Sequence, residues 1–543
     1  MLNAFSKIPE IKNEPIKSYA PKSPERRELR QTIEAMAAED RELPLLIGGK
    51  EVRSDKKIDV RAPHKHSQKL GTLYQGGAKE IENAIVAAKA AKDEWGSASF
   101  DERAAVLLRA AELLAGRFRQ RVNAATMLGQ SKTPHQAEID SACELIDFWR
   151  FNVAFARQIL NDQPYSSPGM WNRVDYRPLD GFVLAVSPFN FTSIAGNLPT
   201  APALMGNTVL WKPATTAALS AQYLMEVLTE AGLPPGVINL VHAPGRLIGE
   251  IAIKHPDLAG IHFTGSTGTF QHMWKTVGEN IASYNCYPRL VGETGGKDFI
   301  FAHSSCDVEA LATAALRGGF EYQGQKCSAA SRIYVPASIW KEFAERFEAK
   351  VKEIKVGDVT DFSNFMGAVI DANAYSDIKG YIDYAKNNPG GKVWLGGNCD
   401  DAEGYFIDPT VVIAEDPKHK LMREEIFGPV VTIHKFEDNQ FNEILRLCDS
   451  TSPYALTGAI FSRDIAVVRK AMHALRFAAG NFYINDKPTG AVVGQQPFGG
   501  SRASGTNDKA GSLVNIMRWT SPRSIKETFD PPRDWKYPYM AAE

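Results

Sequence analysis

The chain lacks the features that would place it among nucleic-acid-binding or membrane proteins. Its formal net charge is −1 over 543 residues, so no strong attraction to nucleic acid or to anionic membrane surfaces is expected. No apolar run approaches the ~20 residues that a bilayer-spanning helix needs. The best candidate, 104–114, is interrupted by Arg109 and Glu112 and has the spacing of an amphipathic helix. The composition therefore predicts a globular chain, long enough for two or three domains.

Cysteine is also scarce, with six residues and no Cys-x-x-Cys pair. This usage argues against a disulfide framework and a structural zinc site, so no metal site is predicted, and it favours a reducing compartment. Residues 1–10 have too short an apolar stretch for a signal peptide and lack the Arg-rich character of a transit peptide. We expect the cytoplasm, with the mitochondrial matrix as the alternative for a eukaryotic source.

Hydrophobic periodicity divides the chain into a helical first part and two alternating α/β sets. A charged arm with a short helix ends near residue 45, and 79–130 and 136–160 are helical in pattern. Short apolar runs then alternate with helical segments, which is the signature of a parallel, doubly wound sheet. The first set has strands at 182–186, 208–211, 237–241 and 260–263, and helices at 219–231 and 247–254. The second has strands at 299–302, 332–335, 430–434, 457–461 and 481–485, and helices at 339–354 and 465–475.

These patterns predict two α/β units joined near 290–292. A further strand at 518–526 and the stretch 163–180 have the character of pairing elements, so we expect a homodimer or a higher homo-oligomer.

Cys327 is the residue with the most informative surroundings. A lone cysteine is more often an inert core residue, but Gly324 allows a close backbone approach here and Lys326 is adjacent. Glu293 lies in a Gly-rich segment, where backbone or ligand comes close. A soft nucleophile and a carboxylate that can activate water together predict covalent catalysis through a thioester. By itself, Glu293 would be read as a solvated carboxylate.

Two polar residues follow predicted strands, at the ends where ligands bind in open α/β sheets. Asn190 could stabilise an oxyanion through its amide, although a turn-forming asparagine is an equal reading. Lys212 could hold ribose hydroxyls or a phosphate, although a surface lysine is the plain alternative.

Two glycine-containing turns suit a phosphate at a helix N-terminus. Gly245 and Gly249 follow one strand, and Gly265 and Ser266 follow the next. Neither turn is a GxGxxG motif, so the signal is weak by itself.

Six motifs in this order resemble the aldehyde dehydrogenase superfamily. They are Ser187–Phe191, Trp211–Pro213, Phe263–Ser266, Glu293–Lys297, Gly324–Cys327 and Glu424–Pro429. The resemblance implies an α/β fold with two doubly wound Rossmann-type domains and a small β oligomerisation element. It implies an NAD-binding domain at 1–292 with a flap at 163–180, a catalytic domain at 293–485, and a return to the cofactor domain at 486–543.

The resemblance also implies a role for each site residue. Cys327 would attack the aldehyde, Asn190 and the Cys327 N–H would hold the oxyanion, and Glu293 would activate water after hydride has passed to the nicotinamide. The cofactor would contact Ser187, Lys212, Gly245, Gly249, Gly265, Ser266, Glu425 and Phe427. NAD is the expected cofactor, although no carboxylate follows Lys212 to repel the 2′-phosphate of NADP.

Further segments resemble the branch of this superfamily that oxidises L-glutamate γ-semialdehyde, the open form of Δ1-pyrroline-5-carboxylate, in proline catabolism. They are Glu144–Phe148, Tyr287–Leu290, Phe320–Tyr322, Asn481–Lys487, Gly494–Gly500 and Ser504–Lys509.

By this resemblance, Glu144 would meet the substrate ammonium, while Ser328, Gly490 and Ala491 would bind its carboxylate. Phe191 and Phe498 would enclose its methylene chain, although core packing is their plain reading. Ala491 stands where the branch often has serine, so one side-chain hydrogen bond is lost there.

Three alternatives remain beside this reading. A broad-specificity or other semialdehyde dehydrogenase would lack the head-group residues, and an acyl-phosphate reductase would lack Glu293. A non-catalytic protein on the same fold would not need Cys327 and Glu293 together. From the length we expect no fused proline dehydrogenase, while a separate proline dehydrogenase partner that passes on the intermediate stays open.

Overall fold

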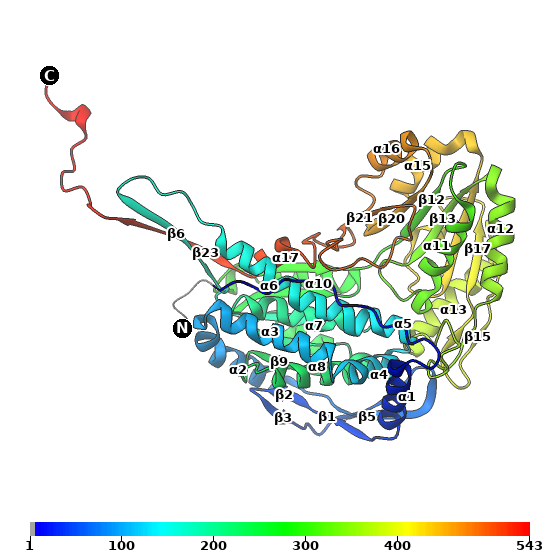
Figure 1. Cartoon of the computed structure of the whole chain (residues 1–543), viewed down its shortest axis with the longest axis horizontal. Coiled ribbons are helices and arrows are strands. Elements are labelled where there is room, and N and C mark those ends of the chain that lie inside the picture. The colour runs from blue at the N-terminus through cyan, green and yellow to red at the C-terminus, as the bar shows by residue number, and fades with distance from the viewer. Residues whose placement is uncertain (1–5) are drawn as a thin grey trace.

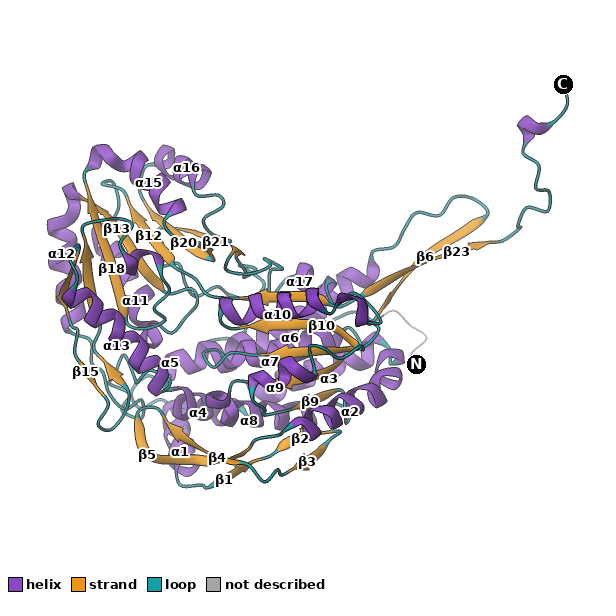
Figure 2. Ribbon diagram, turned by 180° about the vertical axis from the view of Figure 1, so that it is seen from behind, coloured by secondary structure: helices purple, strands orange, loops and turns teal. Residues whose placement is uncertain are grey.

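The computed structural model describes residues 6–543 and shows two α/β lobes with a long ribbon leaving the first of them (Figures 1 and 2). Each lobe is built on a seven-stranded sheet covered by helices, which confirms the predicted α/β class with two doubly wound sheets. Within the described part of the chain, none of the helices combines the length and the apolarity needed to cross a membrane.

The first sheet has the strand order β11-β10-β7-β8-β9-β2-β3. Its first five strands are parallel, and β2 and β3 form an antiparallel hairpin at the edge. The bounds are β2 Leu45–Ile47, β3 Lys50–Val52, β7 Phe182–Val186, β8 Thr208–Lys212, β9 Ile238–Leu240, β10 Leu258–Thr264 and β11 Arg289–Glu293. Because β7 comes first among the parallel strands and lies between β8 and β10, the winding reverses beside it. This is the point at which such sheets bind ligands.

Helices cover both faces of this sheet, and two of them begin with clear caps. The Ser99 hydroxyl and the Glu102 carboxylate form a capping box for α3, and the Ser266 hydroxyl accepts from Thr269 N–H at the start of α10. The helices are α2 Ala78–Ser97, α3 Phe100–Ala115, α4 Arg119–Gln130, α6 Leu145–Asn161, α7 Thr192–Leu204, α8 Ala218–Glu230, α9 Gly245–Ile251 and α10 Thr267–Glu279. A π-helical turn, Glu138–Glu144, joins the short α5 (Pro134–Ala137) to α6.

The second sheet has the order β14-β17-β18-β13-β12-β20-β21, and only β14 is antiparallel to its neighbour. The strands are β12 Asp298–Ala302, β13 Ala330–Pro336, β14 Gly391–Leu395, β17 Thr410–Ala414, β18 Val430–Phe436, β20 Thr457–Phe461 and β21 Asn481–Ile484. The covering helices are α11 Val308–Phe320, α12 Ala337–Lys352, α13 Ala372–Asn387, α15 Phe441–Ser450 and α16 Ile465–Ala474.

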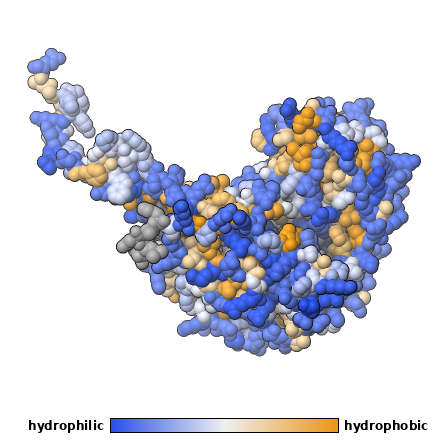
Figure 3. Space-filling model, viewed as in Figure 1, coloured by the Kyte–Doolittle hydropathy of each residue, from blue (hydrophilic) through white to orange (hydrophobic). Residues whose placement is uncertain are grey.

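A two-stranded antiparallel ribbon projects from the first lobe, and the C-terminal tail continues beyond it (Figures 1 and 3). It pairs β6 (Met170–Arg177) with β23 (Ser521–Thr528) over eight residues. A strand therefore lies in each stretch that the sequence analysis expected to pair, although β23 begins at Ser521 and extends to Thr528 instead of spanning 518–526. The two strands pair with each other within one chain, and pairing between copies stays a prediction. A smaller sheet, β1 (Arg41–Leu43), β5 (Lys65–Tyr74) and β4 (Lys57–Ala62), lies with α1 (Pro24–Ala37) at the base of this lobe.

The sequence analysis expected 290–292 to join the two α/β units, but in the structure this segment is part of a strand. It belongs to β11, which adds to the first sheet and ends at Glu293, and the second sheet begins at Asp298. Gly292 within this strand has a physical reason, because a Cβ there would lie 2.2 Å from the Phe270 ring. The domain boundaries themselves stay a prediction.

Candidate active site

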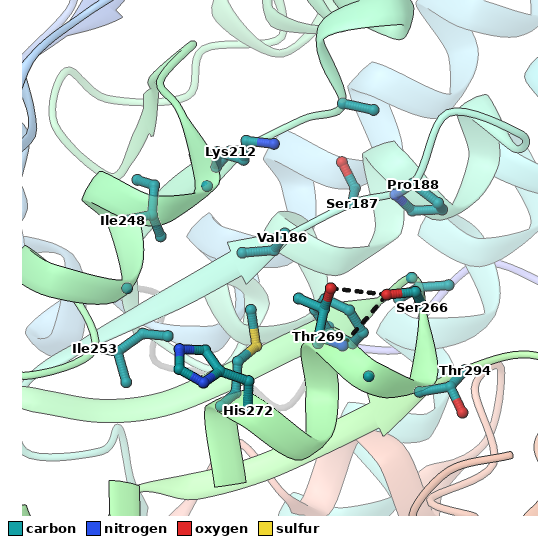
Figure 4. Close-up of a pocket in the computed structure, with 18 of the residues that line it drawn as sticks. Val186, Ser187, Pro188, Lys212, Ile248, Ile253, Ser266, Thr269, His272 and Thr294 are labelled. Carbon is teal, nitrogen blue, oxygen red and sulfur yellow. Dashed lines mark hydrogen bonds between the residues drawn. The ribbon is translucent and has the colours of Figure 1, made fainter. Parts of the chain in front are cut away.

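A cavity of about 1120 Å³ opens at the carboxyl ends of β7, β8 and β10, where the winding of the first sheet reverses. Ser187 and Pro188 follow β7, Lys212 ends β8, and Ser266 is the N-cap of α10 on the opposite wall (Figure 4). The cavity is long enough to run from α9 and α10 to Cys327, which lines its inner end.

Charged and polar groups are spaced along this cavity. Burial lowers the pKa of Lys212, which makes no hydrogen bond through its ammonium within residues 6–543. The Ser266 hydroxyl is held by the Thr269 hydroxyl at 2.7 Å, beside the N-terminus of α10 (Figure 4). Glu425 accepts from Gly296 N–H at 2.8 Å, and burial raises its pKa to about 7. A dinucleotide needs such a set: a cation and a carboxylate for ribose, and a helix N-terminus for phosphate.

A second cavity of about 420 Å³ lies on the other side of Cys327. It lies between the π-helical turn with α6 on one side and the loop 489–493 on the other. Burial raises the pKa of Glu144, on its wall, to about 8. The hydroxyls of Ser328 and Thr489 meet at 2.8 Å on the same wall.

Cys327 lines both cavities, so it lies where the larger and the smaller cavity meet. The turn before it is tightly folded, because Tyr322 and Gln323 have φ of 53° and 55° and Gly324 has φ of 65°. Gly296 passes close behind, since a Cβ there would lie 2.2 Å from the Cys327 carbonyl oxygen. Burial, followed by the nearby Glu293, raises the pKa of the thiol well above its usual range.

Asn190 lies beside this turn, in the loop between β7 and α7. Its amide donates to the Gln325 carbonyl at 3.0 Å, which fixes the side chain against the segment that carries Cys327. The amide carries a second N–H, which makes no other hydrogen bond to the described residues. This N–H is free to donate to an oxygen at the end of the larger cavity.

Glu293 ends β11 and lines the smaller cavity. Its Oε2 has no hydrogen-bond partner in residues 6–543, and burial raises the pKa of the carboxyl well above its usual range. Lys509 opposes that rise. Gly499 allows the close approach, because a Cβ there would lie 2.6 Å from Glu293 Oε1. Once it is ionised, a carboxylate with a raised pKa is a stronger base than an exposed one, so it is suited to take a proton from water.

Every residue predicted from the sequence lies on one of the two cavities. The larger cavity is lined by Ser187, Asn190, Lys212, Gly245, Gly249, Gly265, Ser266, Glu425 and Phe427, together with Cys327. The smaller is lined by Glu144, Phe191, Glu293, Ser328, Gly490, Ala491 and Phe498, again with Cys327. Phe191 and Phe498 therefore do not take the core-packing alternative. Their chemical roles stay predictions.

Two clusters of charged side chains lie near the smaller cavity, and the sequence did not predict that either cluster would form. Lys132 is fully buried, pairs with Asp140 at 2.7 Å, and lies 4.2 Å from the Phe191 ring centroid. The second cluster surrounds Glu321. Burial alone would raise the pKa of this carboxyl, but the neighbouring cations lower it to about 2; they are Lys326, Lys487 and Arg317. One carboxylate among three cations leaves a net positive field there, which favours an anionic group in the cavity. Spacing alone could not have found either group, because their members come together only in the fold.

Besides pairing with Lys132, the Asp140 carboxylate binds the start of α7, next to Asn190 and Phe191 of the site. Its carboxylate oxygens accept from the N–H groups of Thr192 and Ser193, at 3.0 and 2.9 Å. These N–H groups begin α7, directly after Asn190 and Phe191. A buried carboxylate at a helix N-terminus is favourably placed for the helix dipole, so Asp140 fixes the loop that carries both residues.

Comparisons with known proteins agree with this geometry. The family model described as "Aldehyde dehydrogenase family" matches residues 51–525. The chain is 50% identical to the mitochondrial Δ1-pyrroline-5-carboxylate dehydrogenase of Dictyostelium discoideum, over 99% of this chain and 97% of the relative. It is 48% identical to the mitochondrial human enzyme of that name, over 98% and 94%.

Among solved structures, the Δ-pyrroline-5-carboxylate dehydrogenase of Mycobacterium tuberculosis bound with NAD superposes with a TM-score of 0.97. It is 56% identical and covers 100% of both chains. The chain belongs to the aldehyde dehydrogenase family.

Proposed function

We propose that the protein oxidises L-glutamate γ-semialdehyde, the open form of Δ1-pyrroline-5-carboxylate, to L-glutamate with NAD, the second step of proline catabolism. The observation that carries the proposal is the position of Cys327 between two cavities. One has the length and polar groups for a dinucleotide, and the other has the size and charges for a small amino acid. The names of the relatives support this substrate and cofactor.

The larger cavity fits NAD by the chemistry of its walls. Lys212 and Glu425 would hold ribose hydroxyls, and the start of α10 at Gly265 and Ser266 would face the pyrophosphate. No Cβ at Gly245 or Gly249 would meet another atom within 4 Å, so the wall formed by α9 leaves room for a ligand. NAD, when bound, accepts the hydride that leaves the substrate carbon.

The first half of the reaction takes place on the Cys327 sulfur. The thiol loses its proton and the sulfur attacks the aldehyde carbon, which gives a thiohemiacetal. The Asn190 amide and the Cys327 N–H hold the negative oxygen. When that oxygen re-forms the carbonyl, the carbon gives up its hydride and a thioester remains on the enzyme.

The second half needs water on the other side of the thioester. Glu293 takes a proton from this water, whose oxygen attacks the thioester carbon while the Cys327 sulfur leaves. Glu293 is suited to this step because burial raises its pKa well above that of an exposed glutamate, which makes its carboxylate a stronger base. Aldehyde, water and NAD thus give acid, NADH and a proton.

The amino-acid end of the substrate would lie at the far end of the smaller cavity. Glu144 would meet the ammonium, which would favour the ionised form of a carboxyl whose pKa burial raises to about 8. Ser328, Gly490 and Ala491 would bind the carboxylate, and Phe191 and Phe498 would enclose the methylenes.

Assembly and compartment stay predictions. The β6–β23 ribbon carries exposed Trp171 and leaves two open strand edges outside the body, so we propose it as the element that pairs copies of the chain. A proline dehydrogenase partner also stays a prediction. The cytoplasm is the default compartment, and mitochondria are printed in the names of several relatives.

The test is the rate of NADH formation with Δ1-pyrroline-5-carboxylate, beside succinate semialdehyde and a simple alkyl aldehyde. A clear preference for the first, in kcat/KM, supports the proposal. Equal or better rates with the other two would leave the Cys327 chemistry standing and overturn the assigned head-group site. Replacing NAD by NADP in the same assay measures the cofactor preference.

A further inference from the structure

The N-terminal arm crosses the outside of the first lobe before α1 begins. Figure 1 shows this dark blue segment running past α6 towards α5. It contains no helix or strand from residue 6 to residue 20, yet Asn13, Glu14 and Ile16 line the smaller cavity. A segment distant in sequence from Cys327 therefore forms part of the wall around the substrate.

Asn13 connects two parts of that wall through its side chain. Its amide donates to Asp147 Oδ2 on α6 and to the Val493 carbonyl, both at 2.8 Å. Its own oxygen accepts from Gln495 Nε2 at 2.9 Å. One amide thus uses both of its N–H groups and its oxygen to join α6 to the loop 489–493 and the residues that follow it.

The arm is held firmly on either side of this amide. Glu14 N–H donates to Asp147 Oδ1 at 2.7 Å, and the Glu14 carboxylate pairs with Arg119 and Arg150. Arg119 is 1% exposed, so this pair is shielded from solvent on the arginine side. Lys17 N–H donates to Glu138 at 2.8 Å. The arm is therefore a fixed wall, unlike a free terminus.

The loop 489–493 depends on such contacts because it has no regular secondary structure. Its first end is fixed by Lys487, whose ammonium donates to the Thr489 carbonyl at 2.8 Å. Gly490 has φ of 94°, a conformation that glycine adopts without strain. At the other end, Val492 N–H donates to Gln496 at 3.0 Å, and the Val493 carbonyl accepts only from Asn13 within the described residues.

We infer that Asn13 is a positioning residue for the substrate carboxylate. By holding the Val493 carbonyl and Gln495, it fixes the loop whose Gly490 and Ala491 would bind that carboxylate, and the arm closes the cavity on the outside. The inference rests on the proposed function, because it needs a substrate with a carboxylate. No residue of the arm lines the larger cavity, and the Asn13 side chain makes its hydrogen bonds to Asp147, Val493 and Gln495, so we expect neither the cofactor cavity nor the position of Cys327 to depend on Asn13.

The test compares Asn13→Ala with Lys12→Ala in the full chain. Lys12 is the neighbouring residue in the arm and forms only an exposed pair with Glu10, so it is the matched control. Loss of three hydrogen bonds that order the loop predicts a rise of about five- to thirty-fold in KM for Δ1-pyrroline-5-carboxylate in Asn13→Ala. KM for NAD, and kcat/KM for a simple alkyl aldehyde, stay at the wild-type values. Lys12→Ala matches the wild type in all three.

A double-mutant cycle separates positioning from a general loss of stability. Gln495→Ala removes the donor to Asn13, so the effects of the two substitutions on KM are less than additive when the loop is their common target. An unchanged KM in Asn13→Ala overturns the inference, as does an equal loss with the alkyl aldehyde. If the wild type itself does not prefer Δ1-pyrroline-5-carboxylate to the alkyl aldehyde, the proposed substrate is refuted, whatever the result for Asn13→Ala. If Asn13→Ala does not fold, Gln495→Ala alone is the test. It should raise KM for Δ1-pyrroline-5-carboxylate and leave KM for NAD at the wild-type value.

Discussion

Asn190→Ala is expected to lower both kcat and the free energy of unfolding, and the two effects can be measured separately. In the wild type, one amide N–H is bound to the Gln325 carbonyl at 3.0 Å, and the other is left for the oxyanion. Removal of one oxyanion donor lowers kcat by about 10²–10³-fold in other enzymes. The Gln325 carbonyl, which accepts from no other group of residues 6–543, loses its partner in a buried position. That loss costs about 1–3 kcal/mol of unfolding free energy.

The assay combines steady-state kinetics with denaturant unfolding of the same preparation. Asn239→Ala is the matched control, because its buried amide also bonds to backbone groups, at Gly236 O and Gly48 N, and lies on neither cavity. The control should lose stability and keep kcat. If Asn190→Ala keeps kcat within about ten-fold of the wild type while losing the same stability, the oxyanion role is refuted. Asn190 is then a structural amide that holds Gln325.

Three further results are expected from the same geometry. Cys327→Ala abolishes oxidation and leaves NAD affinity nearly unchanged by calorimetry, because the cofactor groups Lys212 and Glu425 are intact; any turnover in this variant contradicts the mechanism. Glu293→Gln accumulates the acyl-enzyme, visible by mass spectrometry as an adduct on Cys327 after mixing with substrate and NAD, and an unmodified protein counts against the assigned base. Activity rises with pH above the range in which an exposed glutamate titrates, because the raised pKa values of Cys327 and Glu293 keep both groups protonated at lower pH. A pH profile of kcat/KM that falls over this range would contradict the need for the deprotonated groups.

Part of the fold could be predicted because its signal is local. The run 182–186 is wholly apolar and is the strand β7, with the same bounds. Helix α7 was not predicted because Pro199 and Pro202 lie inside it, and a pattern with two prolines argues against a helix. Burial among its neighbours stabilises it nonetheless: Thr192, Ala195 and Leu198 are all buried. Long-range packing of this kind leaves no trace in a short window of sequence.

The site divides in the same way. The residues proposed to carry the chemistry directly, such as Cys327 and Glu293, lie in distinctive Gly-rich segments and could be singled out from the sequence. Residues that act on other residues could not, because their significance is a contact at long range. Asn13 and Val493 are 480 positions apart and meet at 2.8 Å. Lys132 has no unusual neighbours in sequence, and only the fold places it over Phe191.

Ala491 shows how the structure can supply what a motif lacks. At this position the sequence predicts the loss of one side-chain hydrogen bond to the substrate carboxylate. The Thr489 hydroxyl, however, lies 2.8 Å from the Ser328 hydroxyl on the cavity wall. Each hydroxyl has one proton, so one proton is used between the pair and the other remains for a ligand. The N–H groups of Gly490 and Ala491 donate to no acceptor in the described chain. In the proposed site, one hydroxyl and two backbone N–H groups would therefore be left to donate to a carboxylate, and its affinity would depend on the shape of the loop more than on the side chain at 491.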